Sequence, residues 1–322
     1  MANGERCVAT LSSAPGIARV VPDCVVTWIT PPVPSSLPAE RAQLEYSSRS
    51  IAFAEDGRRL LRAWGPPERP WVIGVEAQGK RWRLEAWGAR PAEARRAARD
   101  LFSLGHPLPE FYRLVRREPV LAGTERRFRG LRLPRDASVY ESLVHAVVGQ
   151  QLSVRAANVI TRRLFDRVGS YLDAGGVRVP SVPAPARLGA LAVGELRALG
   201  LSRAKSVALR ALARWASAGP PTVEELGRMP REEAVQTLER LRGVGLWTAE
   251  NALLRGAGRT DVFVAGDLGV RAALDRFGAL PRSRPEAEAR SWADRHYPGW
   301  GSYATLYLWR KLVVDRSSAP AG

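Results

Sequence analysis

The stretch Leu238–Asp267 reads LERLRGVGLWTAENALLRGAGRTDVFVAGD and places a glycine-containing turn between two amphipathic runs. Within it, Leu241–Gly245 has two glycines separated by one apolar residue, which permits a tight turn and leaves backbone N–H groups exposed. Because the next helix begins at this turn, its N-terminus and these N–H groups suit one phosphate group. An ordinary helix–helix turn also uses glycine, but the longer pattern L-x-G-V-G-x-x-T-A over Leu241–Ala249 is more specific. It predicts two helices joined by a tight hairpin turn at about 238–255.

Charge and composition indicate a globular protein with a polyanionic partner. The chain has 322 residues, 45% of them hydrophobic, and a net charge of +17. A basic excess of this size is most often an adaptation to nucleic acid. The cysteines, Cys7 and Cys24, are too few for a four-cysteine iron–sulfur cluster within one chain, and no such cluster is expected. No signal peptide or membrane-spanning run is apparent, so we expect a cytoplasmic protein that does not bind membranes.

The first 104 residues are typical of a small antiparallel sheet. Apolar and charged residues alternate in the last predicted strand, which indicates one buried face and one solvent-facing face. The tryptophans here could stack on bases, but the core of a sheet packed on a helix is favoured. The predicted hairpins are Ile51–Ala54 with Arg59–Trp64 around Asp56-Gly57, and Trp71–Glu76 with Arg81–Trp87 around Gln78-Gly79.

The rest of the chain, 105–322, is expected to be helical. Residues 105–136 read as a connector. Ser138 with Glu141, and Thr222 with Glu225, form capping boxes that predict helix N-termini. We expect helices from there to the end of the chain, with a Pro-rich loop near 180–185. The fold class is therefore α+β, with a β-rich domain over 1–104 and a helical domain over 105–322.

Several stretches together resemble one family. The hairpin with its downstream Asp is similar to that of the helix-hairpin-helix superfamily of base-excision DNA glycosylases, most of all its AlkA-type 3-methyladenine branch. The resemblance covers about 105–315 and implies a two-lobed all-α domain with a base pocket between the lobes. Three further stretches match this branch: YESLVHAVVGQQLSV at Tyr140–Val154, LRALGLSRAKSVALRAL at Leu196–Leu212, and PGWGSYATLYLW at Pro298–Trp309.

Asp267 is the candidate catalytic residue. Breaking an N-glycosidic bond develops positive charge on the sugar, which a neighbouring carboxylate stabilises. Asp267 lies 22 residues beyond Gly245 and directly before a helical run that ends at Gly278. Its local position alone favours a helix N-cap, the resemblance favours catalysis, and one side chain can do both. The resemblance assigns no chemistry to the competing carboxylate, Asp261.

Trp247 stands where the strand-cleaving relatives carry a Schiff-base lysine. The lysines of the chain, Lys80, Lys205 and Lys311, all lie outside the hairpin motif. The resemblance therefore implies a monofunctional glycosylase without lyase activity. Trp247 either lines the base pocket or packs under the hairpin, with neither favoured.

A flipped base needs an apolar slot with aromatic faces. The resemblance places Trp309 in this pocket, on a helix with Tyr303, and an electron-rich indole favours cationic alkylpurines. Asn251 and Arg310 depart from the AlkA pattern, in which aromatic residues are usual at both positions. We expect from these departures a more polar pocket, lined by Trp309, Trp247, Asn251 and Tyr303.

The resemblance also assigns DNA and ion contacts. Gly243, Gly245 and Thr248 would bind the DNA backbone. Gln151, with Leu152 beside it, would fill the gap that the flipped nucleotide leaves. The backbone carbonyls of Leu241 and Val244 would hold a structural Na⁺ or K⁺, and no other cofactor is expected.

The sequence thus predicts a monomeric DNA glycosylase that excises alkylated bases of the 3-methyladenine and 7-methylguanine type from double-stranded DNA. Two alternatives stay open: a glycosylase for oxidised or deaminated bases, and a non-catalytic lesion-binding protein. Asp267 and Trp309 together argue against the second alternative, because phosphate binding needs neither side chain.

Overall fold

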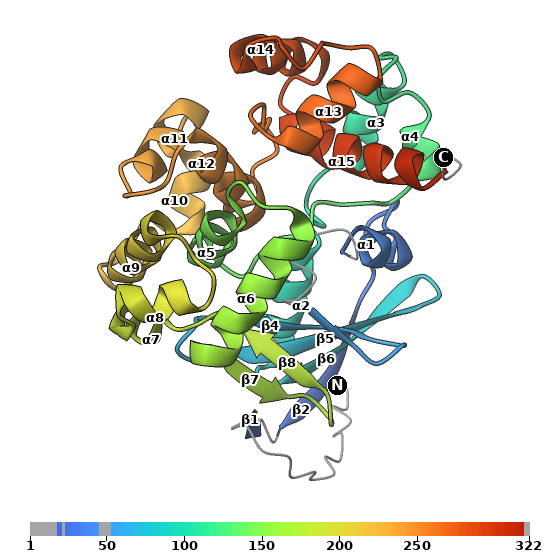
Figure 1. Ribbon diagram of the computed structural model, residues 1–322. Coiled ribbons are helices and arrows are strands. Elements are labelled where there is room, and N and C mark those ends of the chain that lie inside the picture. Colours follow the sequence, from blue (N-terminus) through green and yellow to red (C-terminus); the bar gives the residue numbers. More distant parts are fainter. Residues whose placement is uncertain (1–17, 21–22, 45–52, 319–322) are drawn as a thin grey trace.

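A computed structural model describes residues 18–20, 23–44 and 53–318 (Figure 1). A β-sheet forms one end of the molecule, and two groups of helices lie beyond it, so the α+β prediction is confirmed. We call the group built on α5–α12 the first lobe, and the group of α3, α4 and α13–α15 the second lobe. None of the described helices is long and apolar enough to cross a membrane.

The N-terminal sheet has five antiparallel strands in the order β2-β6-β5-β4-β3. Both predicted hairpins are present, although 51–52 of the first lie outside the described residues. The strands are β2 (Cys24–Ile29), β3 (Phe53–Glu55), β4 (Leu60–Trp64), β5 (Trp71–Gln78) and β6 (Arg81–Trp87). Helix α2 (Pro91–Leu101) covers one face, where Trp82 and Leu84 are buried.

We expected the opposite face of this sheet to be exposed to solvent, but it is buried. It is covered by β7 (Ser170–Asp173) and β8 (Arg178–Ser181), which form a second sheet with β1 (Ala18–Val20). Glu85, expected to face water, is 4% exposed and forms ion pairs with Arg59 and Arg83. The prediction that the chain is helical beyond residue 136 is therefore wrong at 170–181. Two glycines, Gly175-Gly176, with β-prone residues on both sides were the available signal.

The two buried tryptophans of β6 confirm that this region forms a core. Trp82 packs on the α2 side and Trp87 on the β7–β8 side, each 3% exposed. Trp28 is half-buried, with the guanidinium of Arg81 4.8 Å from its ring centroid.

The first lobe contains the hairpin. Its helices begin at the predicted caps: the side chains of Ser138 and Thr222 accept hydrogen bonds from Glu141 N and Glu225 N. The helices are α5 (Val139–Gly149), α6 (Val154–Val168), α7 (Pro185–Ala190), α8 (Val193–Ala198), α9 (Arg203–Ser217), α10 (Val223–Arg228), α11 (Arg231–Glu239) and α12 (Leu246–Ala252), and α12 continues as a π-helical segment, Leu253–Ala257.

The second lobe combines two separate segments of the chain, 105–136 and 262–318. Residues 105–136, expected as a connector, supply two of its helices, and Phe111 packs against Tyr303 and Tyr307 of the last helix. Helix α1 (Leu37–Leu44) lies beside this lobe, and Arg310 donates to the carbonyl of Ala42. The helices of the lobe are α3 (Leu108–Val115), α4 (Thr124–Arg127), α13 (Leu268–Arg276), α14 (Glu286–His296) and α15 (Gly301–Ser318).

Candidate active site

The two glycines of the hairpin have different roles. Gly243 adopts φ +82°, and a Cβ there would lie 2.5 Å from Cβ of Ala208 on α9, so the turn and its packing both require glycine. Gly245 is the N-cap of α12 without a side-chain cap, and a Cβ there would meet nothing within 4 Å. The N-terminus of α12 is therefore open to an anion at Gly245, while Gly243 fixes the turn beneath it.

We expected Thr248 to contact the DNA backbone, but its side chain is not available to a ligand. It is 2% exposed, and its hydroxyl accepts a 2.9 Å hydrogen bond from Nε2 of Gln150. The same amide donates to the carbonyl of Gly243. Any contact of Thr248 with a DNA backbone must therefore use its backbone N–H in the first turn of α12.

Asp267 begins α13 and accepts four hydrogen bonds. Its Oδ1 accepts from the backbone N–H groups of Gly269 at 2.9 Å and Val270 at 3.0 Å. Oδ1 also accepts from the indole of Trp309 at 2.8 Å, and Oδ2 accepts from the indole of Trp247 at 3.1 Å. The helix cap expected from the local sequence is thus present, and it leaves Oδ2 with the greater remaining capacity as an acceptor.

All four donors to Asp267 are neutral, so the carboxylate is oriented without being neutralised. The competing carboxylate differs: Asp261 is paired with Arg259 through contacts of 2.9 and 2.6 Å. Arg259 also donates to the carbonyls of Leu226 and Met229, so this pair ties a loop to α10. Of the two carboxylates, Asp267 is the one whose charge is available to a developing cation.

Trp247 and Trp309 reach Asp267 from different elements, α12 and α15. Both are half-buried and pack against the core of the second lobe. The guanidinium of Arg255 lies 5.5 Å from the ring centroid of Trp309, an interaction that sequence reasoning missed. The structure therefore brings together three sequence-predicted residues, Asp267, Trp247 and Trp309.

Gly269 is a further residue that the sequence did not single out. A Cβ at this position would lie 3.1 Å from Oδ1 of Asp267 and 3.2 Å from Cδ1 of Trp309. Those separations are tighter than ordinary van der Waals contacts. Glycine at position 269 therefore lets the indole approach the carboxylate.

The other residues expected in the pocket point elsewhere. Tyr303 is fully buried in the second lobe, with its hydroxyl 3.1 Å from Nδ1 of His106, and burial raises the pKa of this tyrosine. Asn251 is 3% exposed and donates to the carbonyl of Trp247 in its own helix. Arg310 packs towards α1 and the Phe128 ring. The more polar pocket inferred from Asn251 and Arg310 does not follow from these positions.

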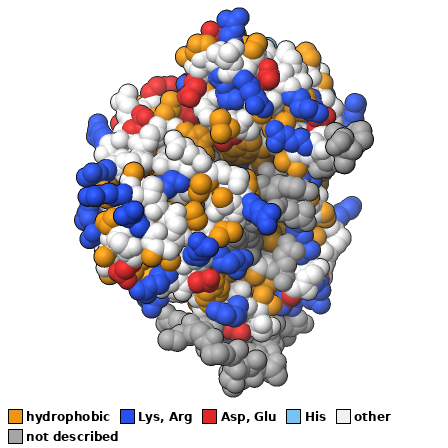
Figure 2. All heavy atoms as spheres, viewed as in Figure 1, with side chains coloured by type: hydrophobic (Ala, Val, Ile, Leu, Met, Phe, Trp, Pro, Cys, Tyr) orange, Lys and Arg blue, Asp and Glu red, His pale blue; other side chains and the backbone are white. Residues whose placement is uncertain are grey.

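The loop after α5 exposes apolar and polar side chains. Gln151 has φ +55°, and Leu152 is 38% exposed, followed by Val154 at 45%. Leu268, next to Asp267, is 82% exposed. On the face drawn in Figure 2, hydrophobic side chains line the hollow between the two lobes, and Lys and Arg side chains are spread over both lobes.

Comparison with known proteins identifies the family. The model of the "HhH-GPD superfamily base excision DNA repair protein" family matches residues 144–294. DNA-3-methyladenine glycosylase 1 of Schizosaccharomyces pombe is 31% identical over 182 residues, which cover 56% of this chain and 75% of the relative. The chain belongs to the HhH-GPD superfamily.

Two other relatives of this HhH-GPD protein extend the comparison. DNA-3-methyladenine glycosylase 2 of Escherichia coli is 36% identical over 180 residues, which cover 56% of this chain but only 60% of that relative. The solved 3-methyladenine DNA glycosylase from Archaeoglobus fulgidus has the same fold, with a TM-score of 0.78, 23% identity, and coverage of 92% of this chain and 100% of that one.

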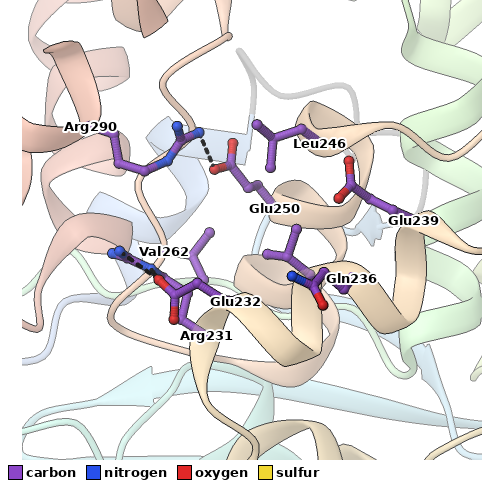
Figure 3. Close-up of a pocket in the computed structure, with 9 residues that line it drawn as sticks. Arg231, Glu232, Gln236, Glu239, Leu246, Glu250, Val262 and Arg290 are labelled. Carbon is purple, nitrogen blue, oxygen red and sulfur yellow. Dashed lines mark hydrogen bonds and ion pairs between the residues drawn. The ribbon is translucent and has the colours of Figure 1, made fainter. Parts of the chain in front are cut away.

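A cavity of about 230 Å³ lies on another side of α12, between the lobes (Figure 3). Glu250 lines it, is 3% exposed, and forms a 2.6 Å ion pair with Arg290 of α14. Burial raises the pKa of Glu250 from 4.5 to about 7, and Arg290 partly offsets this rise. Because Leu246 and Glu250 line the cavity whereas Trp247 faces Asp267, the cavity and the Asp267 site use adjacent faces of α12.

We expect the ionisation of Glu250 to make stability fall as pH rises. Its pKa is raised in the folded state, so the folded protein holds the proton more tightly between about pH 4.5 and 7, and stability declines across that window by up to roughly 3 kcal/mol. Glu250→Gln should flatten this decline, so that the difference in free energy of unfolding between the variant and the unmodified protein shifts in favour of the variant as pH rises from 5 to 8.

Urea unfolding at pH 5, 6, 7 and 8 measures this effect as the difference in free energy of unfolding between variant and parent. Other titrating groups, such as Glu40, are the same in both proteins, so their contributions cancel in this difference. Glu232→Gln is the matched control, because Glu232 lines the same cavity but its side chain is 68% exposed. Parallel stability curves for parent and Glu250→Gln would contradict the assignment.

Proposed function

We propose that this protein is a monofunctional DNA glycosylase that excises alkylated bases, of the 3-methyladenine and 7-methylguanine type, from double-stranded DNA. The observation that carries the proposal is the Asp267 carboxylate, held by two indoles and two backbone amides and paired with no cation among the described residues. Relatives named DNA-3-methyladenine glycosylase support the substrate class. The protein would act as a monomer in the cytoplasm, on chromosomal DNA.

The reaction depends on Oδ2 of Asp267, the oxygen that can accept further interactions. A damaged nucleotide is rotated out of the duplex and its base enters the space near the indoles. As the N-glycosidic bond lengthens, positive charge develops on the sugar, and Oδ2 faces it while Trp309 and the helix amides hold Oδ1. The base departs with the electron pair of the broken bond, and water adds to C1′ and releases a proton to solvent, which leaves an abasic site. An oriented but un-neutralised carboxylate is what this charge development requires.

The aromatic surroundings favour a cationic base. Alkylation at N3 or N7 of a purine gives the base a positive charge, which an indole face attracts. Arg255 already lies over the Trp309 ring, so a cationic base would need the opposite ring face or the Trp247 ring. An oxidised or deaminated neutral base is the second candidate, and the Arg255 contact is the observation that favours it.

The hairpin supplies the sequence-independent contact. Gly245 opens the N-terminus of α12 to a DNA phosphate, and the carbonyls at Leu241 and Val244 offer the oxygen ligands that Na⁺ or K⁺ takes. Leu241 O already accepts from Val244 N at 3.0 Å, which leaves one lone pair for an ion. The ion would hold the turn beneath the phosphate, and no step of the reaction passes through it.

Asp267→Asn should abolish base release while lesion binding remains. Asparagine still caps α13, but it removes the negative charge, and its amide would place N–H against the N–H of Trp247 or Trp309. One charge facing a developing cation in a dry site is worth several kcal/mol, so we expect a loss of about three orders of magnitude or more. The assay is single-turnover excision from a panel of duplexes, each with one damaged base.

Asp261→Asn is the control for that assay, because its carboxylate is structurally paired with Arg259. This variant should have a lower free energy of unfolding, but its excision rate should stay close to that of the unmodified protein. Near-normal turnover by purified Asp267→Asn protein would rule out the catalytic assignment, and release of oxidised but not alkylated bases would decide for the second candidate.

Gly245→Asp should weaken binding to damaged and undamaged duplex alike, by about tenfold or more, because a carboxylate there would face a phosphate. Gly245→Ala should bind normally, since its Cβ has open space, whereas Gly243→Ala should lose stability through contact with Ala208. Fluorescence anisotropy with labelled duplexes measures this. A loss confined to damaged DNA would argue against the phosphate role.

The product should be an intact strand with an abasic site. Strand cleavage requires an amine that attacks C1′ of the sugar, and Trp247 occupies the position of the lyase lysine. Lys205 and Lys311 both donate to backbone carbonyls, and Lys80 lies in the β5–β6 turn. Borohydride should trap no covalent adduct, while alkali should cleave the product. A trapped adduct forming as fast as base release would refute the lyase inference.

A further inference from the structure

The loop between α5 and α6 has a conformation that needs support. Gln151 has φ +55°, which a residue other than glycine rarely adopts. None of residues 150–153 is buried, so the loop adds nothing to a core. Two backbone hydrogen bonds close it: Leu152 N donates to Gly149 O at 3.2 Å, and Gln150 N donates to Ala146 O at 3.0 Å. The conformation of the exposed pair Gln151 and Leu152 must therefore be fixed by polar contacts at the base of the loop.

Lys205 of α9 provides the first of these contacts. Its ammonium group donates to the carbonyls of Val148 at 2.9 Å and Gln150 at 2.6 Å. These carbonyls lie at the C-terminal end of α5, where the helix dipole favours a cation. Burial lowers the pKa of Lys205. The lysine thus links α9 to the start of the loop.

The Gln150 side chain provides the second contact. Its Nε2 donates to the carbonyl of Gly243 and to the hydroxyl of Thr248, both at 2.9 Å. Gly243 is the turn of the hairpin and Thr248 is in the first turn of α12. The base of the loop is thus bonded to α9 on one side and to the hairpin on the other, through four hydrogen bonds.

We propose that Lys205 and Gln150 are positioning residues that hold Gln151 and Leu152 at a fixed place relative to the hairpin, so that these side chains enter the gap left by a flipped nucleotide. The inference rests on the proposed glycosylase function. Lys205 and Gln150 should therefore affect base flipping in paired DNA, in addition to any effect on folding, because their contacts end in an exposed loop.

A pair of substrates separates this role from a merely structural one. In one, 7-methylguanine is paired with cytosine, and its extrusion leaves a gap in the stack. In the other, the same nucleotide is an unpaired bulge, and its extrusion leaves no gap opposite a partner base. Lys205→Met and Gln150→Ala should lose about tenfold or more in single-turnover rate on the paired substrate and less than about twofold on the bulge.

Lys311→Met is the matched control. Lys311 is also half-buried and donates to a backbone carbonyl, that of Val120, in the second lobe. It should leave the ratio of the two rates unchanged. Equal losses on both substrates, or no loss on the paired one, would overturn the positioning role. If Lys205→Met does not fold, Gln150→Ala decides the question.

A second readout does not depend on base release. A duplex with a tetrahydrofuran abasic analogue opposite 2-aminopurine reports occupation of the gap as a fluorescence change on binding. The unmodified protein should change this signal, and Lys205→Met and Gln150→Ala at saturating concentration should reduce the change at least about twofold. If the parent protein releases no base but the variants reduce this signal, the proposed function fails and the positioning role stands. An unreduced signal overturns the positioning role.

Discussion

The carboxylate of Asp267 is held by N–H donors that carry no charge, and the two lobes meet around it. Four hydrogen bonds of 2.8 to 3.1 Å fix both oxygens of this carboxylate. Trp247 brings α12 of the first lobe to this point, and Trp309 brings α15 of the second. An arginine would have held the carboxylate as firmly but would have cancelled its charge, as Arg259 does for Asp261.

Helix α12 connects this site to the rest of the molecule through side chains on different faces. Trp247 donates to Asp267, Thr248 accepts from the loop after α5, and Glu250 pairs with α14. Successive side chains on a helix are rotated by about 100°, so one rotational setting of α12 satisfies all three contacts. The packing of Gly243 on Ala208 fixes that setting at the N-terminal end of the helix.

Local signals in the sequence predicted those features that depend on a few neighbouring residues. The caps at Ser138 and Thr222, the cap at Asp267 and the hairpin turns of the N-terminal sheet are all set by short-range hydrogen bonding, and all are present. The packing of Trp82 between the sheet and α2 was also predictable, whereas Trp87 lies on the face that we expected to be exposed and that β7 and β8 cover.

Features that depend on long-range packing were not predictable. The strands β7 and β8 form because the β4–β6 face needs cover, and their short sequences carry a weak signal. The direction of Arg310 depends on α1, some 268 residues away in the chain. The indole of Trp247 was equally compatible with lining a pocket or packing under the hairpin until the position of α13 was known.

Charged groups of this protein act at long range, whereas neutral groups make the short-range contacts around Asp267. A net charge of +17 attracts any polyanion at long range and cannot tell one base from another. Charges at the lobe junctions are already paired, Arg290 with Glu250 and Arg231 with Asp294. The groups that donate to Asp267 are instead neutral: two indoles and two backbone amides. Net charge therefore cannot supply selection, whereas short-range fit around the Asp267 carboxylate, which pairs with no cation among the described residues, can.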